Sequence, residues 1–286
     1  MTSAPTLAQK SGLLRQILAR RSSLLVAYSG GVDSAFLAWA AHQVLGGQML
    51  AVIADSASLA RTHLEDALAF AREHTIPVEV VETHELDNPA YVRNDALRCF
   101  HCKDELFTVL ERYRTARPFN DRGFDAVAYG VNADDAGDFR PGQQAAQQHH
   151  VLAPLLEAGL NKAEVRELAR QAGLRVWDKP ASACLSSRLE YGRAVTPAAL
   201  NVIERGEDAL RALGFRQFRV RHHGEIVRIE IAQEELPRAL TAQMARDLTA
   251  VFKSLGFKFV TLDLEGFRSG SMNQLLSTEE LLRGRP

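Results

Sequence analysis

Residues 24–34 read LLVAYSGGVDS, and this stretch decides the fold of the chain. Its first part, Leu24 to Tyr28, is a short apolar run typical of a buried parallel strand. A turn with two glycines follows, and we expect a helix from about Ser34 to Leu45. Glycines let a backbone approach an anion closely, and a helix N-terminus offers unpaired N–H groups. The stretch therefore predicts a phosphate-binding loop between a strand and a helix.

The side chains of this loop suit a phosphate held together with a divalent cation. Its candidate residues are Ser29, Gly30, Gly31, Val32, Asp33 and Ser34. The serines add hydroxyl donors, whereas the Asp33 carboxylate does not suit a bare phosphate and fits a Mg²⁺ ion that bridges to pyrophosphate. No Gly-Lys-Ser/Thr follows, so this is not a Walker A loop. The alternative is that the glycines only turn the chain and Asp33 caps the helix.

Apolar strand-like runs recur along the first part of the chain, at 49–53, 78–81 and 126–131, between helical patterns at 6–21, 59–74 and 101–114. Strands that alternate with helices predict an α/β fold with a parallel sheet covered on both faces. Ligands of such sheets bind at the carboxyl ends of the strands. Three polar or glycine-rich segments, 29–34, 54–58 and 130–135, fall there.

The pattern changes after about residue 190. A helix at 197–213, strands at 215–221 and 226–231, a helix at 234–254 and a strand at 258–264 predict a small C-terminal α+β domain. The segment 178–196 contains Pro180 and Gly192 and is typical of a connection. We therefore expect two domains, 1–190 and 191–286.

Composition restricts the class of protein. The chain has 286 residues, 46% hydrophobic and 24% charged, with a formal net charge of −1. These values exclude a disordered chain and provide no global basic field to attract nucleic acid or anionic lipid. No apolar run approaches the roughly 20 residues that span a bilayer, and residues 1–10 lack the features of a secretion signal. We expect a cytoplasmic protein with no membrane or nucleic-acid partner.

The three cysteines are too few, and odd in number, for a disulfide framework. Cys99 and Cys102 form a C-x-x-C pair in RCFHCK, and Cys184 lies in DKPASACLSSR. Basic residues flank both sites and favour thiolates. The C-x-x-C pair can hold a metal, cycle as a dithiol or be incidental, and a buried inert thiol remains the alternative for each cysteine.

The string SGGVDS resembles the PP-loop of the N-type ATP pyrophosphatases, which have an adenine nucleotide alpha hydrolase-like fold. The resemblance implies that ATP is cleaved between its α- and β-phosphates and that a substrate oxygen is adenylylated. It also implies that Asp55 and Ser56 lie near the adenine and ribose, and that Gly130 and Asn132 approach AMP. A simple strand-end turn is the alternative for Asp55 and Ser56.

Further strings make the resemblance more specific over nearly the whole chain. They are RCFHCK, GVNADDAGDFRPG at 130–142, PLLEAGLNKAEVR at 154–166, WDKPASACLSSR at 177–188 and FRVRHHGEI at 218–226. Together they resemble the LarE family, ATP-dependent sulfur transferases of nickel-pincer nucleotide synthesis. The resemblance implies a small-molecule substrate, pyridinium-3,5-biscarboxylic acid mononucleotide, which is adenylylated and converted in two rounds to the bis-thiocarboxylic acid. It also implies a homo-oligomer, a hexamer.

Members of this family obtain sulfur in two ways, and the resemblance carries both over. One type holds a [4Fe-4S] cluster with an extra sulfide on three cysteines, which correspond to Cys99, Cys102 and Cys184. Three thiolates leave one iron of the cubane without a protein ligand, so we favour this type. The other type sacrifices the sulfur of Cys184 and leaves dehydroalanine. A third possibility is zinc bound by three cysteines and a histidine, with His149, His150, His222 and His223 as candidates. His101 is disfavoured because it lies inside the C-x-x-C turn.

Anionic substrates require cations, and arginine binds carboxylates and phosphates with a bidentate fork. Arg219 and Arg221 alternate along a predicted strand and share one face. The resemblance assigns this pair to phosphate binding, whereas a solvated strand face is the alternative. Ser187 and Arg188, beside Cys184, are candidates for orienting the adenylate or the substrate phosphate. Asp135 and Arg140 are weaker candidates, and a His222-His223 pair is more often structural.

The sequence is also compatible with two other functions. A PP-loop tRNA thiolase also combines this loop with cysteines, but it needs a basic surface that a net charge of −1 does not provide. An ATP-binding or metal-storage module would share the loop without turnover. We expect catalysis by Asp33 with Mg²⁺ on ATP, and by Cys99, Cys102 and Cys184 on sulfur.

Overall fold

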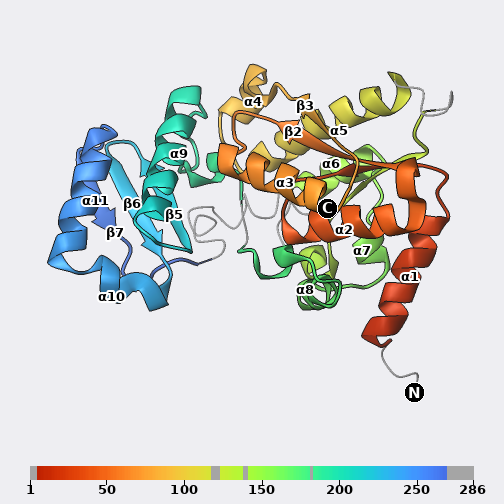
Figure 1. The fold of residues 1–286 in the computed structure, drawn as a ribbon. Coiled ribbons are helices and arrows are strands. Elements are labelled where there is room, and N and C mark those ends of the chain that lie inside the picture. The colour runs from red at the N-terminus through yellow and green to blue at the C-terminus, as the bar shows by residue number, and fades with distance from the viewer. Residues whose placement is uncertain (1–4, 117–122, 138–140, 181–182, 269–286) are drawn as a thin grey trace.

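The computed structural model describes residues 5–116, 123–137, 141–180 and 183–268, which form two sheets with helices around them (Figure 1). The first sheet has four parallel strands in the order β3-β2-β1-β4. The second sheet has three strands in the order β5-β6-β7, with one antiparallel and one parallel pairing. The predicted α/β fold, with a small second α+β part, is confirmed.

The elements of the first part alternate as expected. In chain order they are α1 (Leu7–Ala19), β1 (Leu24–Ala27), α2 (Val32–Leu45), β2 (Met49–Asp55), α3 (Arg61–Glu73), β3 (Val78–Glu82), α4 (Pro89–Val92), α5 (Arg98–Ala116), β4 (Ala126–Tyr129), α6 (Pro141–Gln148), α7 (Pro154–Glu157) and α8 (Lys162–Gln171). Thr6 caps α1 and Asn161 caps α8, each with a reciprocal bond from the third helical residue. Such capping boxes satisfy N–H groups that a helix start leaves unpaired.

Both faces of the parallel sheet are buried. Leu24 and Val26 of β1 pack in one cluster with residues of α1, α2 and α8, whereas Leu25 and Ala27 pack in another with α5 and α6. Successive strand residues point to opposite faces, so a fully apolar strand is buried on both sides. All four residues of β1 are buried. Strand β1 therefore lies at the centre of the sheet, and the loop that follows it emerges at the carboxyl edge.

The second sheet carries its own helices, α9 (Pro197–Ala212), α10 (Leu236–Ala239) and α11 (Ala242–Ser254), around β5 (Phe218–His223), β6 (Ile226–Ile231) and β7 (Phe259–Leu262). The prediction of a single helix over 234–254 is wrong, because α10 ends before Leu240 and a second helix, α11, begins at Ala242. Thr241 accepts a bond from the Met244 N–H and so begins α11 anew. A threonine at this position favours a helix start over helix continuation.

The core of the second part also includes residues that precede position 190. Leu185 and Leu189 are buried in it, and so are Ala60 and Tyr91 from the first part. The first sheet and its helices therefore touch the second part through shared apolar contacts. The boundary at 190 stays a prediction. In the described part of the chain, no helix is long and apolar enough to cross a membrane.

Candidate active site at the carboxyl edge of the parallel sheet

The glycine-rich loop connects β1 to α2 and needs its glycines. Gly30 has a φ of 71°, and a Cβ there would lie 2.6 Å from the Cβ of Ala67. Gly130, at the end of β4, approaches the same loop so closely that a Cβ would lie 2.7 Å from the Ser34 nitrogen. The ends of β1 and β4 thus meet over the start of α2, as expected for neighbouring strands.

Hydroxyl groups hold the loop in shape. The Ser34 Oγ accepts from the Ser29 N–H at 3.2 Å, lies 3.1 Å from the Ser29 Oγ and donates to the Gly31 carbonyl. Gly31 is the N-cap of α2 and has no side chain to occupy the first N–H groups of the helix. Unpaired N–H groups at a helix start bind anions, because the helix dipole favours negative charge there.

Asp33 lies in the first turn of α2 and is held from two sides. The Asn132 Nδ2 donates to its Oδ1 at 3.2 Å, and the Lys162 ammonium forms an ion pair with its Oδ2. Asn132 is buried and its own N–H donates to Asp135 at 3.0 Å. The structure thus brings together Asp33 and Asn132, which the sequence predicted as site residues, and Lys162, which the sequence did not single out.

The turn after β2 carries Asp55 and Ser56. Asp55 forms an ion pair with Arg61 at 2.6 Å, and this hydrogen bond raises the pKa of the Arg61 guanidinium. The Ser56 Oγ lies 3.1 Å from the Ser58 Oγ. The Ser58 carbonyl in turn accepts from the Leu185 N–H at 2.8 Å. The carboxyl edge of the parallel sheet is therefore bonded directly to the loop that carries Cys184.

The cysteines lie on two segments that Arg98 connects. Helix α5 begins at Arg98, earlier than expected, so Cys99 and Cys102 lie in its first two turns and not in a separate turn before it. Arg98 is 5% exposed and donates to the Ser186 carbonyl at 3.0 Å and to the Cys99 Sγ at 3.7 Å. Cys184 directly precedes the 3₁₀ turn Leu185–Arg188. All three are free thiols, with Cys99 exposed and the other two half-buried.

The electrostatic environment differs among the thiols. Burial would raise the pKa of the Cys184 thiol, but the Arg98 charge and the Ser186 hydroxyl outweigh it, so the pKa is lowered. The Cys184 Sγ lies 3.0 Å from the Ser186 Oγ. Burial raises the pKa of Cys102, and the charge of Cys184 raises it further. Positive neighbours and hydrogen bonds favour thiolate, so Cys184 is better suited than Cys102 to react as a thiolate.

Tyr91 lies beside the same thiols. Burial raises the pKa of its phenol, and the charges of Cys184 and Cys102 add to this effect. Cys102 packs in the same apolar cluster as Tyr91 and Leu185, the residue after Cys184, so the C-x-x-C helix start and the Cys184 loop lie close together although they are far apart in the sequence. Among the residues that the structure describes, no group of three His, Cys, Asp or Glu side chains could hold a single metal ion.

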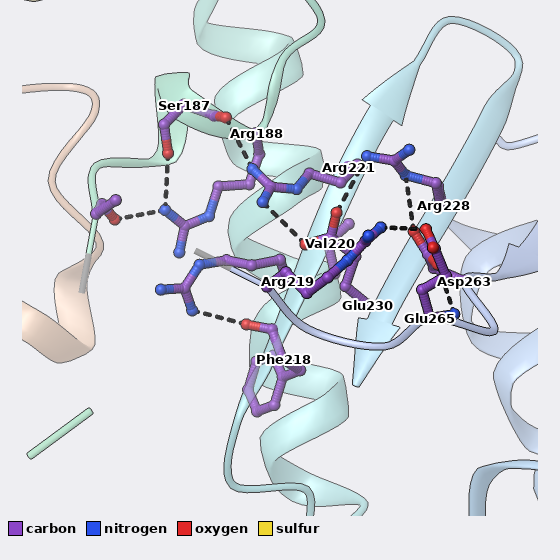
Figure 2. A network of polar contacts seen from close by, with 12 residues as sticks. Ser187, Arg188, Phe218, Arg219, Val220, Arg221, Arg228, Glu230, Asp263 and Glu265 are labelled. Atoms are coloured by element: carbon purple, nitrogen blue, oxygen red, sulfur yellow. Dashed lines mark hydrogen bonds and ion pairs between the residues drawn. The ribbon is translucent and has the colours of Figure 1, made fainter. Parts of the chain in front are cut away.

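An arginine cluster formed by Arg188, Arg219, Arg221 and Arg228 lies between the Ser187–Arg188 turn and strands β5 and β6 (Figure 2). Arg188 is 1% exposed and forms an ion pair with Glu207 at 2.8 Å. Its Nη1 also donates to the carbonyls of Ala183 and Cys184. These contacts hold the Cys184 loop against α9. The Arg188 guanidinium thus donates hydrogen bonds to a carboxylate and to backbone carbonyls of the protein.

Arg219 and Arg221 lie on one face of β5 but differ in surroundings. Arg221 is buried, pairs with Glu230 at 2.8 Å and donates to the Ser187 carbonyl at 3.0 Å. Arg219 is half-buried and lies over the Phe267 ring at 4.8 Å. Burial, followed by the positive charge of Arg188, lowers the pKa of Arg219 to about 10. An anion placed there would relieve this repulsion between cations.

Several predicted residues have other partners. His149 lies 2.9 Å from Asp104 and His223 lies 2.9 Å from Glu190, whereas His222 packs edge-on against Phe257. Arg140 lies outside the described residues, as do residues 181–182 of the Cys184 string. Sequence reasoning missed the partners Lys162, Glu207 and Glu230, and it treated Arg98 only as a flanking charge. The sequence positions of these residues relative to the motifs do not reveal their partners, since each residue meets its partner only in the folded chain.

Known proteins resemble this chain over part or nearly all of its length. The NAD synthase family model matches residues 9–99, which include the PP-loop. An uncharacterized protein from Synechocystis is 42% identical over 92% of this chain and 97% of its own length. A tRNA-specific 2-thiouridylase from Rickettsia rickettsii is 27% identical over 75% of this chain and 67% of its own length.

Another relative has a name that states an enzymatic activity, and it is similar over almost the whole chain. The pyridinium-3,5-bisthiocarboxylic acid mononucleotide synthase of Lactiplantibacillus plantarum is 34% identical over 96% of this chain and 98% of its own length. This alignment spans the PP-loop, all three cysteines and the arginine cluster. The chain therefore belongs to the LarE family of PP-loop ATP pyrophosphatases, which are ATP-dependent sulfur transferases.

Proposed function

We propose that the chain inserts sulfur into pyridinium-3,5-biscarboxylic acid mononucleotide at the expense of ATP. A substrate carboxylate oxygen attacks the α-phosphorus of ATP, and pyrophosphate leaves. Sulfur then attacks the carbonyl carbon of the acyl-adenylate, and AMP leaves with the original oxygen. Two rounds give the bis-thiocarboxylic acid mononucleotide. The observation that carries the proposal is the hydrogen bond from the Leu185 N–H to the Ser58 carbonyl, which joins the nucleotide edge to the thiol loop.

The PP-loop residues supply the first step. The N–H groups at the start of α2 and the hydroxyls of Ser29 and Ser34 would bind the phosphates, and Asp33 would hold Mg²⁺ with its carboxylate. Asp33 fits this role because carboxylate oxygens are the ligands that Mg²⁺ prefers. Phosphoryl and adenylyl transfer require mainly positioning and charge neutralisation. Asp55, Ser56, Gly130 and Asn132 lie at the same edge and are proposed to contact the adenosine.

The three thiols supply the second step. Cys99, Cys102 and Cys184 would hold a [4Fe-4S] cluster, whose unliganded iron supplies a transferable sulfide when the cluster is bound. Arg98 keeps the two thiol-bearing segments together, and its charge stabilises negative sulfur. The alternative is that Cys184 attacks the acyl-adenylate itself and is left as dehydroalanine. Its lowered pKa suits either role.

The substrate phosphate is proposed to bind at the Arg219–Arg221 pair of β5, beside Ser187 and Arg188, with Arg219 as its direct partner. Burial and the positive charge of Arg188 lower the pKa of the half-buried Arg219, and a bound dianion would offset both effects. Arg221 and Arg188 are engaged by Glu230 and Glu207, so we assign them to shaping the site around Arg219. We also propose that the protein is cytoplasmic, since thiols stay reduced in the cytoplasm. The resemblance to the LarE family leads us to propose a homo-oligomer as well.

The decisive experiment separates the two chemical steps. We expect Cys184→Ala to form AMP and pyrophosphate from ATP and the dicarboxylate, but no thiocarboxylate. Asp33→Asn serves as the matched control and should lose both products, because adenylylation precedes sulfur transfer. AMP formation lost together with sulfur transfer in Cys184→Ala would contradict the role given to this cysteine.

The source of sulfur requires a second experiment. Protein purified or reconstituted without oxygen should contain about four irons and acid-labile sulfide per chain, and replacement of any one cysteine should remove them. Protein without iron, in which Cys184 becomes dehydroalanine after incubation with ATP and substrate, would establish the sacrificial route. Stoichiometric zinc would contradict both and favour the thiolase function that the Rickettsia relatives carry in their name.

A further inference from the structure

Lys162 neutralises the carboxylate on which the proposed magnesium site depends. Its ammonium pairs with Asp33 Oδ2, while Asn132 donates to Oδ1 at 3.2 Å. The side chains of Lys162 and Asp33 are 34% and 19% exposed, so the ion pair reaches the surface beside the PP-loop. Both oxygens of Asp33 therefore have protein donors before any nucleotide is present.

The backbone at Lys162 is firmly anchored, whereas its side chain has room to move. The Lys162 N–H donates to Asp134 Oδ2 at 2.9 Å, and the Ala133 N–H donates to the Leu160 carbonyl at 2.8 Å. Asn161 caps α8 through bonds exchanged with Glu164. These contacts bind the start of α8 to the loop after β4. A flexible four-carbon chain then lets the ammonium swing while the helix stays in place.

A lysine ammonium and a divalent cation compete for the same carboxylate oxygen, because each needs its lone pairs. ATP brings negative phosphate oxygens to the loop, and these are an alternative partner for the ammonium. We propose that Lys162 is the resident counterion of Asp33 and that, when ATP enters with its metal, Lys162 releases the carboxylate and binds the phosphates that leave as pyrophosphate. Lys162 thus offsets charge on the leaving group.

This inference rests on the ATP-binding half of the proposed function and makes two opposite predictions for one variant. Lys162→Met should bind ATP with Mg²⁺ about 10- to 100-fold more weakly, because charge-assisted bonds to phosphate are lost. The same variant without nucleotide should bind Mn²⁺ more tightly, because Asp33 is released from its partner. A purely structural lysine would not strengthen metal binding.

The test uses the full chain. Calorimetric titration measures the affinity for ATP with Mg²⁺, and the electron paramagnetic resonance signal of free Mn²⁺ measures the affinity for the metal. Lys10→Met is the matched control, since Lys10 belongs to α1 and pairs with Glu164 of α8 at 2.8 Å and not with Asp33. It should leave both affinities unchanged, and Lys162→Arg should retain most ATP affinity. Thermal unfolding of each variant checks that the fold is retained.

Two results would overturn the inference. Wild-type ATP affinity in Lys162→Met would mean that the lysine does not bind phosphates. Weakened ATP binding with unchanged Mn²⁺ binding would mean that no exchange on Asp33 takes place. Neither result depends on sulfur, so a wild-type protein that binds ATP but forms no AMP with the dicarboxylate would refute the proposed function alone.

Discussion

The Arg98 Nη1 donates to the backbone carbonyl of Ser186 at 3.0 Å and so ties the start of α5 to the loop that carries Cys184. The same guanidinium donates to Asn94, whose amide in turn bonds the carbonyls of Glu190 and Arg193. A buried cation with several hydrogen bonds is costly to disrupt, because its partners would be left unpaired. This network accounts for how two distant cysteine motifs come to share one region.

Arg98→Met should slow alkylation of Cys184 at neutral pH. Arg98 lowers the pKa of Cys184 against the effect of burial, so its loss should move the pH dependence of alkylation to higher pH. The measurement is peptide mass spectrometry of metal-free protein treated with iodoacetamide across a pH series. Arg170→Met, which removes an exposed ion pair with Glu167, is the control. An unchanged pH profile for Arg98→Met would refute the electrostatic assignment.

Glu207→Ala should destabilise the fold strongly. It would leave the Arg188 guanidinium, 1% exposed, without its carboxylate partner, and breaking such a buried pair costs about 3–5 kcal/mol. Urea denaturation measures this change in the free energy of unfolding. Glu167→Ala, which breaks an exposed pair, should change it little. Comparable effects of the two substitutions would show that the Arg188–Glu207 pair does not hold the Cys184 loop.

The same pair gives a pH dependence of stability. Burial would raise the pKa of Glu207, but the charge and hydrogen bonds of Arg188 outweigh it, so the folded-state pKa is lowered. A carboxyl with a lowered pKa stabilises the fold above its unfolded pKa of about 4.3, and this stability is lost as pH falls. Denaturation at a series of acidic pH values should therefore show a smaller acid-induced loss of stability in Glu207→Gln than in wild type. An identical slope would contradict this linkage.

Gly130→Ala should weaken ATP binding at least about tenfold, because its Cβ would lie 2.7 Å from the Ser34 nitrogen and displace the start of α2. Gly47→Ala is the matched control, since a Cβ there meets nothing within 4 Å. Calorimetric titration with ATP and Mg²⁺ compares the two. Equal affinities in both variants would show that the contact between β4 and the PP-loop does not shape the nucleotide site.

Arg219→Met should raise the KM for the mononucleotide about tenfold or more and leave ATP affinity unchanged, because it removes a charge-assisted bond to the substrate phosphate. Arg216→Met, an exposed arginine three residues earlier, is the control. Steady-state kinetics with varied mononucleotide is the measurement. A changed kcat with an unchanged KM would assign Arg219 to another role.

The elements around the PP-loop could be predicted because local signals decide them. The apolar run 24–28, the paired glycines and the alternation of strands and helices each reflect a local physical constraint, and the structure places β1 at Leu24–Ala27 and α2 at Val32–Leu45. The sequence predicts a turn at the C-x-x-C pair and a helix from residue 101, whereas α5 begins at Arg98. Residues in the first turn of a helix carry no distinctive spacing of their own.

The partners of the site residues could not be predicted, because they depend on long-range packing. Lys162 meets Asp33 across 129 positions, and Arg188 meets Glu207 only once α9 packs against the 3₁₀ turn. The buried state of Arg221 likewise follows from Glu230 on the neighbouring strand. An alternating Arg-Val-Arg pattern indicates a shared face, but it does not tell which arginine is paired with a carboxylate.

The most direct test of the central claim is product analysis after anaerobic incubation of the full chain with ATP, Mg²⁺ and pyridinium-3,5-biscarboxylic acid mononucleotide. The account predicts one AMP for each oxygen of the substrate replaced by sulfur, detected by mass spectrometry as the thiocarboxylate and then the bis-thiocarboxylate. AMP formation without any sulfur-containing product, in protein that retains all three cysteines and a full iron and sulfide content, would contradict it.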